Sequence, residues 1–384
     1  MGRTARCAGF VAILMSFTLA SNASSMPAWV SEDSSITSTL EFGRAEHESG
    51  RYLQAEEIFR GVILRLENQK ERGPNLVMAL GSLASALLAQ QRYEESEQTL
   101  SRAIAILRSE QTINQRKLPV LLGALGKLYQ ETGRFQQAKG TLREALKLGN
   151  RLLTNSPDYL SGLHTINGTL YLRTGDQKRA ESEFRKALSL IQQDSRENQL
   201  QRSQIMGNLA VLYFAQHKWG LAEKTLLRAL HDVEQWRGMD HPDLCVLLSN
   251  LALVYFNLHD FAQAEKVLRR NLAIQRTVFG SESVQTAAAS AYLAEVLEER
   301  GNYVEATQLF TEALRVQEQI LGQRHTDVAT TLERFAALLR KTNEIAKSEQ
   351  MEGRAASIRL ETDYTVSISK LPNRRDKPAA LPIR

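Results

Sequence analysis

Small residues recur along this chain at an almost fixed step, and this repeat constrains the fold more than any other feature. The second small column of each copy has steps of 41 and then 42 residues: Ala55, Ser96, Ala138, Ala180, Ala222, Ala264, Ala306 and Ser348. The first small column lies twelve residues earlier in each copy: Gly43, Ala84, Gly126, Gly168, Ala210, Ala252, Ala294 and Ala336. A fixed period of this length is typical of stacked repeats. The chain is therefore expected to form a stack that presents an extended surface.

Residues 247–274 illustrate the content of one copy. Apolar residues follow helical spacing on both sides of a polar break at His259 and Asp260, which predicts two antiparallel helices joined by a tight turn. The first residue of this break recurs in every copy: Gly50, Gln91, Gly133, Gly175, His217, His259, Gly301 and Asn343. Glycine and asparagine suit the left-handed backbone that ends a helix. The two small columns predict that the paired helices cross closely, since larger side chains would push them apart.

The motifs inside each copy resemble the tetratricopeptide repeat. A leucine, a small residue and a tyrosine three positions further on occur in residues 125–129, 209–213 and 251–255, and phenylalanine follows the second small column at 59, 184 and 310. The 42-residue step is similar to the longer variant found in kinesin light chains and many bacterial proteins, and residues 238–243 resemble its Gly and His-Pro connection. This resemblance covers about residues 36–358, with seven full repeats and a degenerate eighth. It implies an all-α fold, a right-handed superhelical solenoid of antiparallel helix pairs.

The two ends of the chain differ from the repeats. Residues 1–23 combine an arginine-bearing start, a 14-residue apolar-rich stretch and a small-residue cleavage site, which is the layout of a secretory signal peptide. They predict an exported protein, periplasmic or secreted, with no membrane span in the mature chain; the alternative is an anchor formed by an uncleaved N-terminal segment. Residues 24–35 are expected to be a linker and residues 359–384 a disordered basic tail.

Charge and motif content argue against several classes of function. The excess of basic residues lies at the two ends of the chain, so the high isoelectric point does not indicate a repeat body that binds nucleic acid. The sequence has no phosphate-binding glycine loop, no Cys-x-x-Cys and no His-Glu-x-x-His. Cys245, the one cysteine after residue 23, is expected to be a small buried side chain. We therefore expect no catalytic residues, no cofactor and no metal site.

The resemblance to the tetratricopeptide repeat also implies where a partner binds. In that family the first helix of each pair mainly lines a concave groove, and the kinesin-light-chain-like type places asparagines two residues before the small residue. Asn208 and Asn250 match this position in consecutive repeats, and an amide can both donate to and accept from a peptide backbone. A bridge between neighbouring helices is the alternative role for both asparagines.

Other residues on the same predicted face complete the candidate groove. Phe214 and Phe256 lie one repeat apart and offer apolar contacts, with packing between repeats as their alternative role. The remaining candidates are polar: Lys127, Gln130, Gln204 and Ser249.

Three functions are compatible with this sequence. The first is a non-catalytic scaffold that binds a peptide or protein segment in its groove. The second is a self-assembling or membrane-complex assembly factor that uses the ends of the solenoid, and the third is a regulatory subunit of an enzyme.

Overall fold

The computed structural model describes residues 35–109, 115–191 and 196–369, and every regular element within these ranges is a helix. The all-α expectation is thereby confirmed. The described residues form two compact units, 35–239 and 240–369. Among the described helices, none is both long and apolar enough to cross a membrane.

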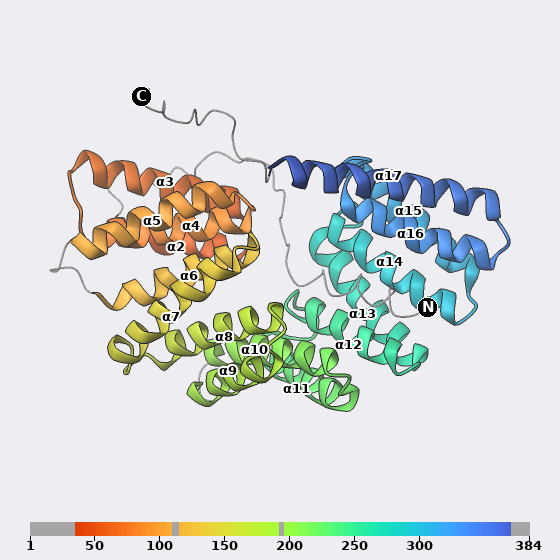
Figure 1. The fold of residues 1–384 in the computed structure, drawn as a ribbon, viewed down its shortest axis with the longest axis horizontal. Helices are drawn as coiled ribbons and strands as arrows, with labels where there is room; N and C mark the ends of the chain where they lie inside the picture. Colours follow the sequence, from red (N-terminus) through yellow and green to blue (C-terminus); the bar gives the residue numbers. More distant parts are fainter. Residues whose placement is uncertain (1–34, 110–114, 192–195, 370–384) are drawn as a thin grey trace, which may run out of the picture. The chain divides into compact units, whose positions relative to one another are not determined.

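The first unit contains five helix pairs within its described residues (Figure 1). Its first helices are α2 (Ile36–Glu48), α4 (Pro74–Ala89), α6 (Leu118–Glu131), α8 (Pro157–Arg173) and α10 (Arg196–Ala215). Its second helices are α3 (Tyr52–Asn68), α5 (Tyr93–Ser109), α7 (Phe135–Leu152), α9 (Gln177–Leu190) and α11 (Trp219–Arg237), and the short 3₁₀ helix η2 (Gln115–Lys117) precedes α6. Each of α3, α5, α7 and α9 also packs against the first helix of the next pair, so the pairs stack in sequence order.

The second unit repeats this arrangement with three pairs. Its first helices are α12 (Leu244–Asn257), α14 (Val284–Glu299) and α16 (Thr326–Lys341), and its second helices are α13 (Phe261–Phe279), α15 (Tyr303–Leu321) and α17 (Ile345–Ser369). Figure 1 shows α14 to α17 stacked against one another. Contacts between α13 and α14 and between α15 and α16 join consecutive pairs.

The turn within each pair has the same backbone in all eight copies. The residue at the break has a positive φ throughout, including the three that are neither glycine nor asparagine: Gln91 (60°), His217 (57°) and His259 (60°). The second helix begins two residues later in every copy. This confirms the expected left-handed column, and the surrounding structure imposes it even where the side chain makes it costly.

The two small columns mark close helix crossings, as expected. A Cβ atom added to Gly43 or Gly168 would lie 2.6 Å from the ring of Phe59 or Phe184 respectively. All eight members of the second column are fully buried. Where serine replaces alanine, its hydroxyl donates to the main-chain carbonyl of the other column, Ser96 to Ala84 at 2.8 Å and Ser348 to Ala336 at 2.9 Å. A polar atom thus enters the crossing without losing its hydrogen bond.

The last helix extends beyond the residue at which the repeats were expected to end. The solenoid was expected to end at residue 358, but α17 continues to Ser369. No glycine or proline lies between Gly353 and Pro372, so nothing in the sequence stops the helix there. Arg359 also ties this stretch to α16 through Glu333 at 2.7 Å. The predicted signal peptide, most of the linker and residues 370–384 of the predicted tail lie outside the described residues.

Candidate functional site

The candidate site is the inner face, which we define as five positions on each first helix. They are counted from the residue of the first small column, such as Ala252. The positions lie six, three and two residues before it and one and four residues after it, so they include Asn250 and Phe256. Glycines at the position three residues before let neighbouring first helices approach closely. A Cβ atom on Gly81 would lie 3.0 Å from Leu121, and one on Gly123 would lie 2.5 Å from Leu163. First helices of adjacent pairs are therefore in direct contact along this face.

Gln130 is a bridge between repeats and is not open to a ligand, contrary to the sequence prediction. Its side chain is 2% exposed. Its Nε2 atom donates to the main-chain oxygen of Ile166 at 2.9 Å, and its Oε1 atom accepts from Thr169 Oγ1 at 3.1 Å. Arg173 donates to the main-chain oxygen of Gln130 at 2.7 Å. Both ends of the amide thus bind α8.

Ser249 is likewise committed to the interior, which removes it from the candidate groove. It is 9% exposed, and its hydroxyl donates to the main-chain oxygen of Cys245 at 2.9 Å. The same hydroxyl accepts from Nδ2 of Asn271, a fully buried residue of α13, at 2.8 Å. Gln275 extends this network by donating to Asn271 Oδ1 at 3.1 Å. The serine therefore joins α12 to its own second helix.

The two asparagines and two phenylalanines occupy separate units. Asn208 and Phe214 lie on α10 in the first unit, whereas Asn250 and Phe256 lie on α12 in the second, and all four are half-buried. The Nδ2 atom of Asn250 is buried and has no hydrogen-bond partner among the described residues. A buried donor without an acceptor is uncommon in folded proteins and calls for an explanation.

Each of the two phenylalanines has an aromatic contact within its own repeat. The ring of Phe214 lies 4.6 Å from that of Trp219, and Phe256 lies 5.4 Å from Phe261, both edge to face. Trp219 and Phe261 are the residues that begin the second helices. The contact with Trp219 or Phe261 therefore holds one edge of each phenylalanine ring against the turn of the same repeat.

Lys127 on α6 and Gln204 on α10 are exposed. Of the eight predicted residues, four are exposed or half-buried in the first unit: Lys127, Gln204, Asn208 and Phe214. In the second unit, Asn250 and Phe256 are half-buried. These residues are retained as the candidate binding residues of each unit.

The second unit also carries charged side chains on its inner face. Arg334 of α16 lies over the ring of Tyr292 of α14 at 4.5 Å and pairs with Glu295 at 3.6 Å. Tyr292 and Arg334 occupy the same position as Asn250 in the next two repeats, and this 42-residue spacing is the signal that could have revealed them. The column therefore offers an amide, a phenol and a guanidinium in consecutive repeats.

Lys341 of α16 joins two carboxylates of α14 at the edge of the same face. Its Nζ atom lies 2.9 Å from Glu298 Oε1 and 2.8 Å from Glu299 Oε1. Glu298 is 4% exposed. Burial raises its pKa above the ordinary value despite the hydrogen bond from Lys341.

A buried charged cluster in the fourth repeat lies inside the helix pair. Glu183 of α9 receives hydrogen bonds from Asn167 at 3.1 Å and Lys186 at 3.0 Å and pairs with His164 at 2.8 Å. Burial alone raises the pKa of Glu183, but these three groups lower it to about 2. These contacts join α8 to α9 within the fourth repeat.

Cys245 also offers no chemistry. It is 1% exposed, and burial, followed by the nearby charge of Asp243, raises the pKa of its thiol to about 12. A raised pKa disfavours the thiolate that nucleophilic attack requires. Within the described ranges, no group of three or more histidine, cysteine, aspartate or glutamate residues is placed to hold a metal ion.

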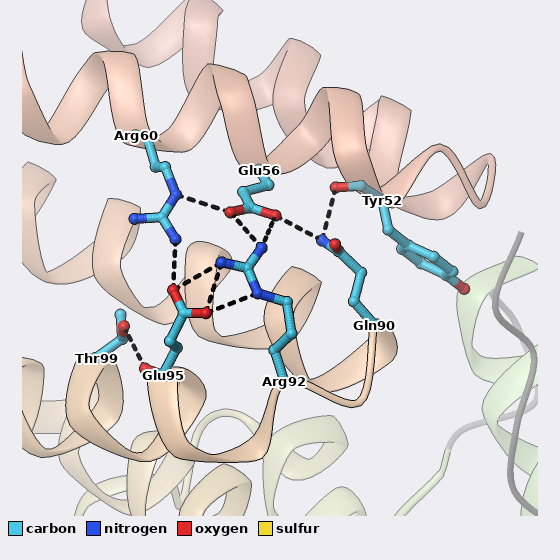
Figure 2. Close-up of polar contacts among 7 residues, drawn as sticks. All are labelled: Tyr52, Glu56, Arg60, Gln90, Arg92, Glu95 and Thr99. Carbon is cyan, nitrogen blue, oxygen red and sulfur yellow. Dashed lines mark hydrogen bonds and ion pairs between the residues drawn. The ribbon is translucent and has the colours of Figure 1, made fainter. Parts of the chain in front are cut away.

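The second helices carry ion pairs that join neighbouring repeats. Figure 2 shows the carboxylate of Glu56 between Arg60 of its own helix, at 2.8 Å, and Arg92 of the next repeat, at 2.6 Å. Arg92 continues to Glu95 on α5. Burial raises the pKa of Glu56, but hydrogen bonds from Arg60, Gln90 and Arg92 leave it below its ordinary value. This outer network fixes the register between the first two repeats.

Comparisons with known proteins agree with this architecture. Sequence profiles of the tetratricopeptide repeat match residues 34–109, 75–151, 201–277, 243–319 and 285–361, and a second profile of the same name matches residues 168–194. No curated protein matches the sequence.

Solved structures with a similar fold include three proteins of low sequence identity. BtubC (BKLC) from P. vanneervenii is 19% identical, with a TM-score of 0.52 over 65% of this chain and 98% of that one. The apo quorum sensor NprR from B. thuringiensis is 12% identical, with a TM-score of 0.61 over 84% of this chain and 87% of that one. A Rap protein complexed with Competence and Sporulation Factor is 13% identical, with a TM-score of 0.52 over 86% of this chain and 98% of that one. At these identities the likeness concerns the fold alone.

The repeat columns, the eight identical turns and the profile matches over well over half of the chain lead to one conclusion. This chain belongs to the tetratricopeptide repeat family.

Proposed function

We propose that this protein is an exported, non-catalytic scaffold that holds an extended peptide or protein segment on its inner face. The observation that carries the proposal is Asn250, whose Nδ2 donor is buried without a partner. Leaving such a donor unpaired costs about 1–3 kcal/mol. A rotation of the half-buried side chain would bring this donor to the carbonyl oxygen of a bound peptide, which would recover the cost.

Three further points support this proposal. Phe256 is half-buried beside Asn250 on α12 and can contact an apolar side chain of the ligand, and Asn208 with Phe214 gives the first unit the same combination. Tetratricopeptide repeats serve in protein–protein interaction. NprR is described as a quorum sensor, and Rap was solved with Competence and Sporulation Factor, so this fold accommodates ligand recognition of that kind.

The alternatives receive less support. Assembly through the end of the solenoid would need an unpaired apolar end. The eighth repeat instead places Glu352 where the seventh has Phe310, and Glu352 pairs with Arg340 at 2.6 Å. A polar outer face is the expected property of a capping repeat. A regulatory-subunit role is the special case in which the bound segment belongs to an enzyme.

The binding role is tested with a library of 12-residue peptides displayed with free C-termini and selected on the immobilised protein. Selected peptides are labelled with fluorescein, and their dissociation constants are measured by fluorescence anisotropy. N208A/N250A should weaken binding by about tenfold, since each lost backbone hydrogen bond contributes about 0.5–1.5 kcal/mol. Q136A/Q137A removes two exposed amides from α7 and should leave binding unchanged.

Two outcomes would contradict the proposal. One is that no peptide is selected by the wild-type protein, and the other is equal affinity for the wild type and N208A/N250A. Circular dichroism of both variants checks that helicity is retained. Export is tested separately by sequencing the N-terminus of protein recovered from the periplasm or medium of producing cells, where an intact Met1 would contradict it.

A further inference from the structure

Two connections of the second unit place a histidine at the start of a first helix. His325 is the N-cap of α16, and its Nδ1 atom accepts a hydrogen bond from the main-chain N–H of Asp327 at 3.2 Å. His241 makes the same contact before α12, where its Nδ1 atom accepts from the N–H of Asp243 at 3.2 Å. Because an N–H group can only donate, this contact requires a neutral imidazole that carries its proton on Nε2.

The third connection of the unit provides a natural comparison. Ser283 occupies the equivalent position, 42 residues after His241 and 42 before His325. Its hydroxyl accepts from the N–H of Thr286 at the start of α14, at 3.2 Å. A serine hydroxyl keeps its protonation state near neutral pH, whereas imidazole changes its charge near about pH 6.5. The same position thus holds a cap that protons can remove before α16 and one that they cannot remove before α14.

The turn that His325 caps carries part of the core of the last repeat. Val328 and Ala329 are fully buried and belong to one apolar cluster with Leu314 of α15 and Ile358 of α17. Loosening this turn therefore weakens the packing of α16 against both neighbouring helices. An end repeat opens more easily than the others because a neighbouring repeat supports it on one side only.

Protonation of His325 exchanges one partner for a weaker one. Its Nδ1 atom becomes a donor, so the N–H of Asp327 loses its acceptor. The charged ring can still pair with the carboxylate of Asp327, whose Oδ2 atom lies 3.6 Å from Nδ1. Both side chains of this pair are exposed, so the pair contributes less than a cap, and a cation at a helix N-terminus is unfavourable.

We propose that His325 is a proton-sensitive cap whose protonation loosens the last repeat. The neutral ring stabilises the folded repeat, so its contribution is present above the pH range in which histidine is protonated and is lost as the pH falls through about 6.5. The proposal concerns α16 and its packing, and it does not depend on the proposed peptide ligand.

The other charged groups at this end of the repeat come from the connection and from the helices beside it. Arg324 precedes the cap and pairs with Glu361 of α17 at 3.4 Å, and Glu318 of α15 pairs with Arg354 of α17 at 2.5 Å. Carboxylate side chains generally change their charge near about pH 4. The range from about pH 8 to about pH 5 therefore reports mainly on histidine.

Helix α14 adds three titratable groups on the other side of α16. Burial raises the pKa of Tyr292, so its phenol stays neutral in this range. Glu295 pairs with Arg334 at 3.6 Å. Burial also raises the pKa of Glu298, which pairs with Lys341 at the opposite end of α16. Protonation of Glu298 relieves a cost of burial, which is opposite in sign to the loss of a cap.

Amide hydrogen exchange of the full-length protein tests the proposal. It is followed by mass spectrometry at about pH 8 and about pH 5 and corrected for the intrinsic exchange rates at each pH. In wild type, the protection of α16 peptides relative to α14 peptides should fall about fivefold at the lower pH, which is the effect of losing one cap. H325S installs the hydroxyl found at Ser283 and should abolish this fall.

Three further variants separate the cap from other causes. H259N replaces an exposed histidine of the same unit at a left-handed turn position that suits asparagine, and it should keep the wild-type response. E298Q should also keep the fall in α16 protection. S283H should create a new acid-dependent fall in the α14 peptides, because it places a titratable cap before that helix.

Two results would overturn the proposal. The first is equal corrected protection of the α16 peptides at both pH values in wild type. The second is a fall that persists in H325S, which would assign the acid response to another group. If H325S does not fold, S283H decides the question, and the proposal fails if the α14 peptides of that variant show no new dependence on pH.

Discussion

The two units are built from the same repeat pattern, but they fill one equivalent core position with different kinds of residue. Eleven residues after the second small column, the first unit places buried residues without polar side chains: Leu66, Leu107, Gly149, Ile191 and Val233. The first two repeats of the second unit place Gln275 and Gln317 there, 6% and 3% exposed, and the Oε1 atom of each lacks a hydrogen-bond partner among the described residues. The last repeat has the exposed Arg359 at this position. The same backbone thus accepts an apolar or a polar core residue. The backbone of a repeat is set by its small columns and turn, whereas its stability depends on how each remaining position is filled.

The second unit compensates only in part for its buried amides. Gln275 donates to Asn271, which in turn donates to Ser249, so one chain of hydrogen bonds links α12 to α13. Partly satisfied networks of this kind cost stability but favour one register over others. The first unit instead relies on a continuous apolar cluster that extends from Leu40 to Leu163.

The largest expected effect on stability comes from placing glutamine, the residue of the second unit at this core position, into the first unit. Leu107→Gln should lower the free energy of unfolding by about 2–5 kcal/mol, because it removes buried apolar surface and adds an amide with no prepared partner. Chemical denaturation followed by circular dichroism measures this change. A loss below about 0.5 kcal/mol, the level of an ordinary surface substitution, would show that the two units do not differ at this position.

An intermediate effect should appear on acidification, with opposite signs in the two units. The folded-state pKa of Glu183 in the first unit is lowered to about 2, so its contribution is present above the unfolded pKa and is lost as the pH falls from about 5 towards 2. The folded-state pKa of Glu298 in the second unit is raised by burial, so lowering the pH relieves a cost instead. Acid should therefore weaken the first unit more than the second.

The variants Glu183→Gln and Glu298→Gln separate these two contributions. Glu183→Gln should cost about 1–3 kcal/mol at pH 7, and this difference from wild type should disappear near pH 2. Glu298→Gln should leave Lys341 with Glu299 alone and should reduce the benefit of acid. Denaturation midpoints at several pH values measure both, and a difference for Glu183→Gln that stays constant from pH 7 to pH 3 would contradict the assignment.

The smallest effect is expected for the reverse exchange. Gln317→Leu should change the free energy of unfolding by less than about 1 kcal/mol, and the change should be stabilising. It removes an unpaired buried acceptor and adds apolar surface of similar volume. Thermal unfolding of the variant beside wild type measures the shift. A large destabilisation would mean that the glutamine has a partner essential to the fold and that the comparison of the two units fails at this residue.

The fold followed from the sequence because its determinants are local and repeated. The break residue identified the turn even at Gln91, His217 and His259, where neither glycine nor asparagine marks it, because its place within the period was already fixed by the other copies. The small columns likewise predicted the close crossings at Gly43 and Gly168. Eight copies of one pattern supply the comparison that a single copy lacks.

The candidate site could be predicted only in part. The sequence placed Gln130 and Ser249 on the first-helix face, but both are buried in hydrogen bonds that reach α8 and α13. These properties depend on atoms contributed by other helices, which the spacing within one helix does not reveal.

The sequence by itself therefore determined the repeat, the helix pairing, the turn geometry and the order of stacking. Each of these follows from residue type at a fixed local interval, through helical periodicity and backbone preference. Only the tertiary structure decided which polar side chains are consumed by packing and which are left for a ligand. That outcome is set by close approach between repeats, where the glycines at 81 and 123 bring first helices together and the side chains of one repeat satisfy or cover those of the next.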